Sequence, residues 1–271
     1  MGDVVQRIDS ATIAAVIEAN INAELLSFAL LPGAVLHDGP RSVWLDTGST
    51  GIAYFNQVVH ADFASGDADA AIEEIVDHFR RHGRSFTWQI GPVTRPADLD
   101  RFLPAHGLTF VEDEPGMAVE LDHLHQDAAF PPQLEIETVR DLAGLKTWVD
   151  VWLFPVPEEA RPLFVDAFHQ RGFGDESRWR YYLGRSNGQP VAVSALSAGE
   201  GVAGVQYVVT VPAARRRGIG MALTLRVLRE ARALGYRVAV LTASPDGEGI
   251  YRRIGFREYC RVRRYEWEPP S

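Results

Sequence analysis

Residues 205–222 read VQYVVTVPAARRRGIGMA, and this stretch decides how the rest of the chain is interpreted. An apolar, largely β-branched run ends at Pro212, and three arginines and a Gly-x-Gly follow before a helix-forming segment begins. The pattern predicts a strand, a turn and a helix N-terminus. Glycines let the backbone close on an anion, and the first N–H groups and the dipole of the helix face it. The stretch therefore predicts a phosphate-binding loop.

Two other phosphate-binding motifs do not fit this loop. A dinucleotide fingerprint needs a third Gly or Ala where this chain has Leu223, and an acidic residue at the end of the next strand, which is missing. A P-loop needs Gly-Lys-Ser/Thr, which the stretch lacks. The remaining alternative is a solvated arginine turn before an ordinary helix.

Composition indicates a globular chain with room for two domains. The 271 residues are 46% hydrophobic and 23% charged, and the first twenty carry acids and no basic n-region. No uninterrupted apolar run approaches membrane-spanning length. The lone Cys260 excludes an intrachain disulfide and lies in an alternating run, which favours packing over nucleophilic chemistry. We expect a cytoplasmic protein with no membrane partner.

Charge is distributed unevenly along the chain. Residues 1–133 hold 7 Arg/Lys and 20 Asp/Glu, whereas residues 134–271 hold 20 and 16. The acidic first half and the net charge of −9 argue against nucleic acid as a partner. The basic second half contains the anion loop. Two units of different function are indicated.

Hydrophobic periodicity predicts a complete α/β unit around the loop. Its expected strands are 134–139, 178–185, 189–195, 205–211, 238–242 and 258–267, and its expected helices are 142–152, 158–169, 221–234 and 247–254. The first half is expected to contain helices at 9–31, 68–82 and 98–105 and strands at 42–45, 52–59, 86–90, 109–111 and 116–121.

A polar segment with Pro131-Pro132, residues 122–133, separates the halves and is interpreted as a linker. His123-x-His125 within it offers two ligands without a nearby Cys or acid at suitable spacing, so no metal is expected there.

The loop Arg215-Arg216-Arg217-Gly218-Ile219-Gly220 resembles the Arg/Gln-x-x-Gly-x-Gly/Ala signature of the GNAT (Gcn5-related) N-acetyltransferase superfamily. The order of elements over 134–271 is similar to that fold. A second signature, an aromatic residue on a short helix and then Gly-Phe, is matched by Tyr251, Gly255 and Phe256. The resemblance implies an acyltransferase with a mixed sheet that uses acetyl-CoA as cosubstrate and no metal.

The first half reads as a degenerate copy of the second. Residues 79–84 match 229–236, and residues 102–108 match 250–256. At the place of the arginine loop stands Phe63-Ala64-Ser65-Gly66-Asp67-Ala68, whose acidic surroundings repel pyrophosphate, and Leu103 replaces Tyr251. The expected architecture is two tandem GNAT-like domains, 1–121 and a catalytic 134–271. Generic α/β patterning is the alternative.

The resemblance assigns roles within the second half. The cofactor-binding residues it implies are Val208, Val209, Thr210, Arg215, Arg216, Arg217, Gly218, Ile219, Gly220, Met221, Ala222 and Ser244. Tyr251 is the expected general acid, because a phenol is protonated at neutral pH and can donate to a departing thiolate. For Tyr251 the alternative is a core aromatic, and for Ser244 an N-cap without a catalytic role.

The general base cannot be read from the sequence. The strand before the loop has no Glu at the positions where many family members place one, and Glu200, His169 and Asp175 are candidates beside a water chain. Residues 152, 154, 173 and 179, all aromatic, are expected near the acceptor, and core packing is the alternative for each one singly.

Tandem architecture with one inactive half resembles mycothiol synthase-like enzymes and implies a small-metabolite amine as acceptor, for a monomer or homodimer. The rivals are a protein N-terminus or lysine as acceptor, a non-catalytic acyl-CoA sensor, and nucleic-acid binding through the arginines.

Overall fold

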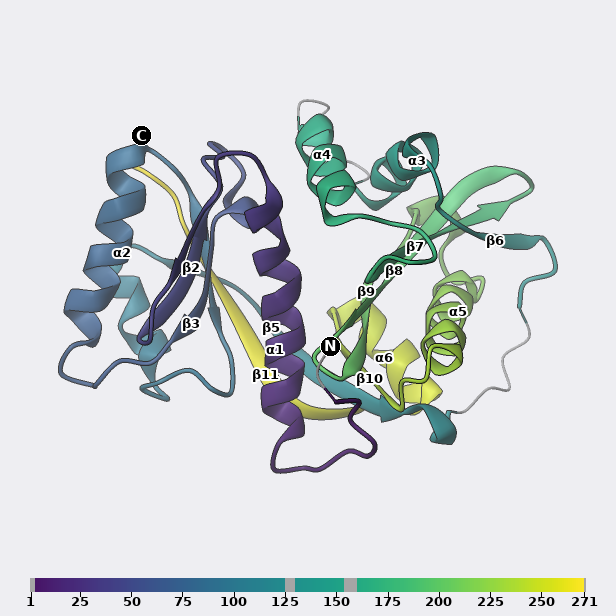
Figure 1. The fold of residues 1–271 in the computed structure, drawn as a ribbon, viewed down its shortest axis with the longest axis horizontal. Coiled ribbons are helices and arrows are strands. Elements are labelled where there is room, and N and C mark those ends of the chain that lie inside the picture. The colour runs from purple at the N-terminus through teal and green to yellow at the C-terminus, as the bar shows by residue number, and fades with distance from the viewer. Residues whose placement is uncertain (1–2, 125–129, 154–159, 271) are drawn as a thin grey trace. The chain divides into compact units, whose positions relative to one another are not determined.

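The computed structural model describes residues 3–124, 130–153 and 160–270 (Figure 1). Its contacts group into two compact units. Unit 1 comprises Met1–Asn20 and Met117–Tyr259, and unit 2 comprises Ile21–Gly116 and Cys260–Ser271. These units are defined by packing, whereas the boundary expected at 122–133 concerns where two tandem domains join along the sequence. That boundary stays a prediction. Part of that segment, and Phe154 with the start of the helix expected at 158, lie outside the described residues.

Unit 1 contains the elements predicted around the anion loop, in the predicted order. They are β6 (Leu134–Thr138), α3 (Leu142–Trp152), α4 (Arg161–Arg171), β7 (Trp179–Ser186), β8 (Gln189–Gly199), β9 (Val202–Thr210), α5 (Ile219–Ala233), β10 (Val238–Thr242) and α6 (Pro245–Ile254). Neighbouring strands follow the order β10-β9-β8-β7-β6. The β6–β9 ladder is antiparallel, and β10 joins β9 in parallel. The mixed sheet of the expected fold is confirmed.

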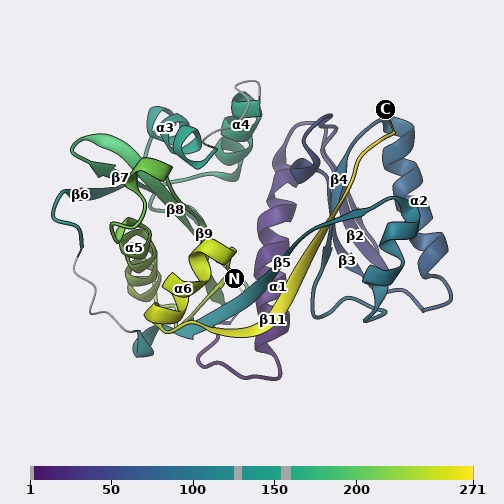
Figure 2. The same cartoon turned by 180° about the vertical axis from the view of Figure 1, so that it is seen from behind.

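The helices of unit 1 cover both faces of this sheet, as two consecutive tyrosines of β7 show. Side chains of neighbouring strand residues point to opposite faces. The Tyr181 ring lies 4.9 Å from that of Trp148 on α3, whereas Arg226 of α5 lies over the ring of Tyr182 at 4.9 Å. Helices α3 and α5 therefore pack on opposite faces (Figures 1 and 2).

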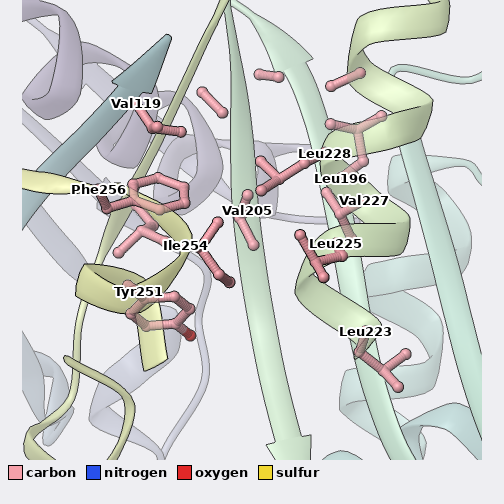
Figure 3. Close-up of a cluster of buried hydrophobic side chains, with 14 of the residues drawn as sticks. Val119, Leu196, Val205, Leu223, Leu225, Val227, Leu228, Tyr251, Ile254 and Phe256 are labelled. Carbon is pink, nitrogen blue, oxygen red and sulfur yellow. The ribbon is translucent and has the colours of Figure 1, made fainter. Parts of the chain in front are cut away.

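The core of unit 1 is built between α5 and the sheet (Figure 3). Leu223, Val227 and Leu228 of α5 are fully buried and belong to one cluster with Leu196 and Val205 of the strands. Burial of each such aliphatic side chain stabilises the fold by about 1.5–3 kcal/mol. This packing holds the first turn of α5 at the end of β9.

Unit 2 departs from the expected elements at several points. After the end of α1 and before β5, its described strands and α-helix are β1 (Val35–Asp38), β2 (Ser42–Asp46), β3 (Gln57–Ala61), α2 (Ala68–His82) and β4 (Phe86–Ile90). The strand expected over 52–59 is wrong in its first half, because Ala53–Phe55 forms a 3₁₀ turn that buries Phe55. Strand β1 was not predicted, since Val35 and Leu36 are exposed and show no alternation.

Three long elements of the first half also differ in detail. The helix expected over 9–31 is α1 (Ile13–Leu26) followed by a 3₁₀ turn. The helix expected over 98–105 is two 3₁₀ turns, and the two expected closing strands form one continuous strand, β5 (Thr109–Glu120). The last strand, β11 (Arg257–Trp267), pairs antiparallel with β4 over its final five residues.

One segment of the described chain, Ile13–Leu30, is long and apolar enough to cross a membrane by length and composition. Core helices of water-soluble proteins pass the same test. Here Ile13, Ile17, Leu25 and Phe28 are buried within the protein, which favours the core-helix interpretation.

Candidate acyltransferase site

The parallel strands β9 and β10 separate toward their carboxyl ends. They pair only where Ala203 faces Ala239 and Gly204 faces Val240. Beyond this pairing, residues 206–210 of β9 are half-buried. In open α/β sheets ligands bind outside the carboxyl ends of the strands, where the backbone groups of a separated strand can pair with an extended ligand.

A β-bulge bends β9 where it separates from β10. Val209 faces Val193 and Gln206 faces Ala195, so β9 advances three residues while β8 advances two. Tyr207 lies in this bulge with φ 55°, a left-handed conformation that is uncommon for a bulky residue. Bulges bend a strand and are frequent beside active sites. No pattern in the sequence predicted this bulge, whose one local signal is a tyrosine in a valine-rich run.

The arginine loop joins this end of β9 to α5. Arg215, Arg216, Arg217 and Gly218 are exposed, and Gly218 caps the helix in a left-handed conformation with φ 78°. No side chain caps the helix, and the first N–H groups of a helix have no intrahelical acceptor. The loop therefore leads into a helix N-terminus, as predicted, whose first backbone N–H groups have no intrahelical acceptor. Buried Ile219 and Ala222 hold this first turn in place.

Three elements meet at this loop. A Cβ added at Gly220 would lie 3.6 Å from Ile250 Cδ1 of α6 and 3.7 Å from Thr210 Oγ1 of β9. Arg215 Nε donates to the Thr210 carbonyl oxygen at 3.1 Å, and its Nη1 lies 3.7 Å from Asp246 at the start of α6. The end of β9, the start of α5 and the start of α6 thus form one surface.

The charge of this surface is supplied by two of the three arginines. Asp246 partly neutralises Arg215, whereas Arg216 and Arg217 make no ion pair with any residue in the described parts of the chain. Guanidinium groups form charge-assisted, often bidentate hydrogen bonds with phosphate oxygens. The loop can hold a pyrophosphate through its N–H groups and these two side chains.

Tyr251 lies on α6, the helix whose Asp246 and Ile250 border the loop. Its side chain is 8% exposed and packs edge-on against Phe256 at 5.9 Å, with its hydroxyl directed away from Phe256 (Figure 3). A Cβ added at Gly247, one turn earlier, would lie 2.9 Å from the Tyr251 ring. Glycine at 247 is therefore needed for this ring position, a requirement that the sequence analysis did not detect.

Ser244 is the N-cap residue of α6, but its hydroxyl makes no capping hydrogen bond. Its carbonyl oxygen accepts from the N–H groups of Gly247 and Glu248 at 2.9 and 3.0 Å. The capping alternative for the Ser244 side chain is therefore not realised, and the exposed hydroxyl stays available to a ligand.

The three candidate bases are not joined to this surface by any contact among the described residues. Glu200 lies in the turn that precedes β9, at the opposite end of that strand from Thr210. Asp175 forms an ion pair with Arg140 at 3.1 Å, and the ring contact of His169 is with Phe173. A water chain stays the simplest proton acceptor.

Aromatic side chains surround the bulge on the α3–α4 face. The ring of Tyr207 lies 5.0 Å from Trp152, 5.5 Å from Phe168 and 5.6 Å from Trp148, and its hydroxyl accepts from Arg171 Nη1 at 2.9 Å. Two of the four aromatic residues expected near the acceptor, Trp152 and Trp179, belong to this cluster. Phe173 contacts His169 instead, and Phe154 lies outside the described residues.

The first half repeats the backbone of this region without its chemistry. Strands β3 and β4 are parallel and flank α2, as β9 and β10 flank α5. The N–H of Leu108 donates to the Leu103 carbonyl oxygen at 3.1 Å, and that of Phe256 to Tyr251 at 3.0 Å. Leu103 is fully buried, and Asp67 replaces the glycine cap at the start of α2.

Comparison with known proteins agrees with this geometry. Residues 145–256 match the family model described as acetyltransferase (GNAT) family. The chain is similar to a GCN5-related N-acetyltransferase from Kribbella flavida, with 23% identity and a TM-score of 0.72 over 96% of each chain. No curated protein sequence matches it.

Two further solved structures are similar over nearly their whole length. One is a tandem GNAT protein from the clavulanic acid biosynthesis pathway, with 15% identity and a TM-score of 0.60 over 97% of this chain and 98% of that one. The other is a GCN5-related N-acetyltransferase from Sphaerobacter thermophilus, with 19% identity and a TM-score of 0.60 over 97% and 92%. At these identities the likeness establishes the tandem fold.

Proposed function

This chain carries a GNAT acetyltransferase domain at residues 145–256 and is an acyltransferase; from that premise we propose that it moves an acetyl group from acetyl-CoA to a primary amine of a small metabolite. The separation of β9 from β10 beside the arginine loop carries the proposal, because it leaves a strand edge next to an anion site and a tyrosine.

Each part of acetyl-CoA has a matching group on this surface. The pyrophosphate accepts hydrogen bonds from the N–H groups of 218–221, which precede the first intrahelical bond, and from Arg216 and Arg217. The amide-containing pantetheine arm adds to β9 as an extra strand through the backbone of Val208, Val209 and Thr210. Ser244 contacts this arm from the opposite wall, since its hydroxyl makes no capping hydrogen bond.

The reaction is direct transfer within a complex of both substrates. The lone pair of the neutral amine attacks the thioester carbonyl carbon while a strand N–H near the bulge stabilises the charge that develops on its oxygen. The carbon–sulfur bond then breaks, and the sulfur takes the proton of the Tyr251 hydroxyl. The proton released by the amine leaves through water, and Tyr251 regains its own from solvent.

The acceptor binds near the bulge on the α3–α4 face. Trp152 and Tyr207 are the half-buried members of the aromatic cluster, so their rings can contact a ligand that enters beside β9. Aromatic side chains at a small-molecule site supply apolar contact while a few polar groups fix orientation. A small metabolite with an apolar body and a primary amine fits this description.

We propose that the first half binds no acetyl-CoA, because Asp67 and Leu103 stand where the second half has its loop glycine and Tyr251. Its role is to support or shape the second half, with domains at 1–121 and 134–271. The cytoplasm stays the expected location.

Tyr251→Phe tests the mechanism. Removing the acidic hydroxyl should lower kcat by about 100-fold or more, the usual contribution of general acid catalysis, while leaving acetyl-CoA affinity within twofold. Turnover is measured as free-thiol release over an amine panel, and binding by calorimetry, where one acetyl-CoA per chain is expected.

Tyr236→Phe is the matched control, because Tyr236 is a similarly buried tyrosine of the same unit that lies after α5. Tyr236→Phe should change neither kcat nor the affinity for acetyl-CoA. Unchanged turnover in Tyr251→Phe would remove the proposed role of Tyr251. Stoichiometric acetyl-CoA binding without thiol release from any amine would instead identify an acyl-CoA sensor.

A further inference from the structure

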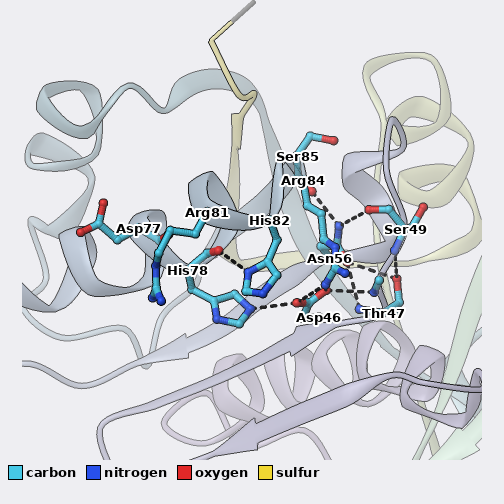
Figure 4. Close-up of polar contacts among 11 residues, drawn as sticks. Asp46, Thr47, Ser49, Asn56, Asp77, His78, Arg81, His82, Arg84 and Ser85 are labelled. Carbon is cyan, nitrogen blue, oxygen red and sulfur yellow. Dashed lines mark hydrogen bonds and ion pairs between the residues drawn. The ribbon is translucent and has the colours of Figure 1, made fainter.

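A polar cluster lies in unit 2, where the end of β2 meets the C-terminal turns of α2 (Figure 4). Its centre is Asp46, whose side chain is only 5% exposed. His78 and His82 extend toward it from α2, and Arg84 follows the helix. The acyltransferase chemistry uses none of these residues.

Asp46 is held as a carboxylate. Arg84 Nη1 donates to its two oxygens at 2.8 and 2.6 Å, the Gly48 N–H donates at 2.9 Å, and His78 Nε2 lies 2.8 Å from Oδ2. The Gly48 N–H and the Arg84 guanidinium can only donate hydrogen bonds, so the carboxylate accepts at both oxygens and carries no proton of its own. The oxygen facing the histidines is therefore an anionic donor atom.

The tautomer of His82 follows from its contact with the helix backbone. Its Nδ1 lies 2.7 Å from the carbonyl oxygen of His78, which can only accept a hydrogen bond. Nδ1 must therefore carry a proton, and in the neutral ring Nε2 keeps a free lone pair. Metal-binding histidines are commonly oriented in this way, by donating their second nitrogen to a backbone carbonyl.

The three side chains are close enough to share one ion. One potential ligand atom from each of Asp46, His78 and His82 lies within 4.8 Å of the others. The histidines are four residues apart on one helix, so both side chains project from the same face. Two imidazoles and one carboxylate form a donor set typical of Zn²⁺ and of non-haem iron.

We propose that Asp46, His78 and His82 form a binding site for a divalent transition-metal ion of the Zn²⁺ class. The ion replaces the hydrogen bond between His78 Nε2 and Asp46 Oδ2, and these two atoms move apart to bind it. The proton on His78 Nε2 passes to Nδ1, so the ring stays neutral and its lone pair points to the metal. A solvent molecule completes the coordination shell, because His82 lies at the exposed end of the helix.

Arg84 sets the strength of this site. Its positive charge contacts the same carboxylate and opposes a second cation there, so the expected affinity is micromolar, weaker than that of a structural zinc site. His37 borders the cluster with its ring 5.4 Å from His78, and its Nε2 is buried without a hydrogen-bond partner among the described residues. It is a third imidazole beside the cluster, and its Nε2 is shielded from solvent although the residue is partly exposed.

Zn²⁺ titration by calorimetry tests the proposal, with the full chain free of affinity tags. We expect one micromolar site in the wild type and a loss of affinity of about 10-fold or more in His82→Gln, since removing a ligand costs at least as much as removing its supporting partner. His60→Gln on β3 and His123→Gln in the linker are matched controls that should bind Zn²⁺ as the wild type does.

A second measurement needs no variant. Carbethoxylation of histidines, read by mass spectrometry, should slow at His78 and His82 when Zn²⁺ is added and stay unchanged at His60. Absence of Zn²⁺ binding, equal affinity in His82→Gln and wild type, or protection of other histidines instead would each overturn the proposal.

Discussion

Replacing Gly218 with alanine should destabilise the protein, whereas the same replacement at Gly220, two residues later, should not. Gly218 has φ 78°, and a Cβ added there would meet no atom closer than 3.9 Å. The cost is therefore conformational, about 1–2 kcal/mol for placing a non-glycine residue in the left-handed region.

Gly220 differs because it lies in the first turn of α5. A Cβ there would make ordinary contacts, at 3.6 Å from Ile250 and 3.7 Å from Thr210. Alanine in a helix is more favourable than glycine by up to about 1 kcal/mol. The two variants should thus differ in free energy of unfolding by about 2 kcal/mol, or roughly 4–8 °C in Tm for a domain of this size.

Thermal unfolding monitored by circular dichroism measures this difference, with both variants and the wild type at equal concentration. Acetyl-CoA titration of Gly220→Ala should give wild-type affinity, since the added methyl group causes no clash. Equal Tm values for the two variants, or a more stable Gly218→Ala, would refute the left-handed cap and with it the proposed geometry of the anion loop.

Two further predictions concern charge. Arg216→Gln combined with Arg217→Gln should weaken acetyl-CoA binding and reduce the dependence of its affinity on salt. These two arginines have no ion-pair partner among the described residues, and a counterion is released from them when phosphate binds. Titrations at two ionic strengths measure the affinity and its salt dependence, and an unchanged salt dependence would contradict the assignment. Hydrogen bonds from His106 and Arg80 hold the pKa of Glu73 below its ordinary 4.5, so the stability they contribute is present above that value and is lost as pH falls through the lowered pKa. The Tm of the wild type should therefore exceed that of Glu73→Gln by less as pH falls. A difference in Tm that grows on acidification would show that the hydrogen bonds of Glu73 with His106 and Arg80 contribute no such stability.

Local patterns in the sequence predicted most elements of unit 1. Helix α3 begins and ends where expected, at Leu142 and Trp152, because Asp141 caps it through the Gly144 N–H at 2.7 Å and apolar residues recur along one face. Prediction was poorer in the first half. Strand β5 continues through Pro115, which is buried, and Ala53–Phe55 forms a 3₁₀ turn that buries Phe55, so burial overrides local propensity at both places.

The anion loop can be predicted from the sequence alone, because its strand, arginines, glycine cap and helix are contiguous and their conformations follow from short-range hydrogen bonding and dihedral preferences. The folded chain was needed to locate the point where β9 leaves β10, the bulge at Tyr207 and the contact between Asp46 and His78. These features arise from pairing and packing between residues that are distant in the chain, and such contacts leave no periodic signal in a single sequence.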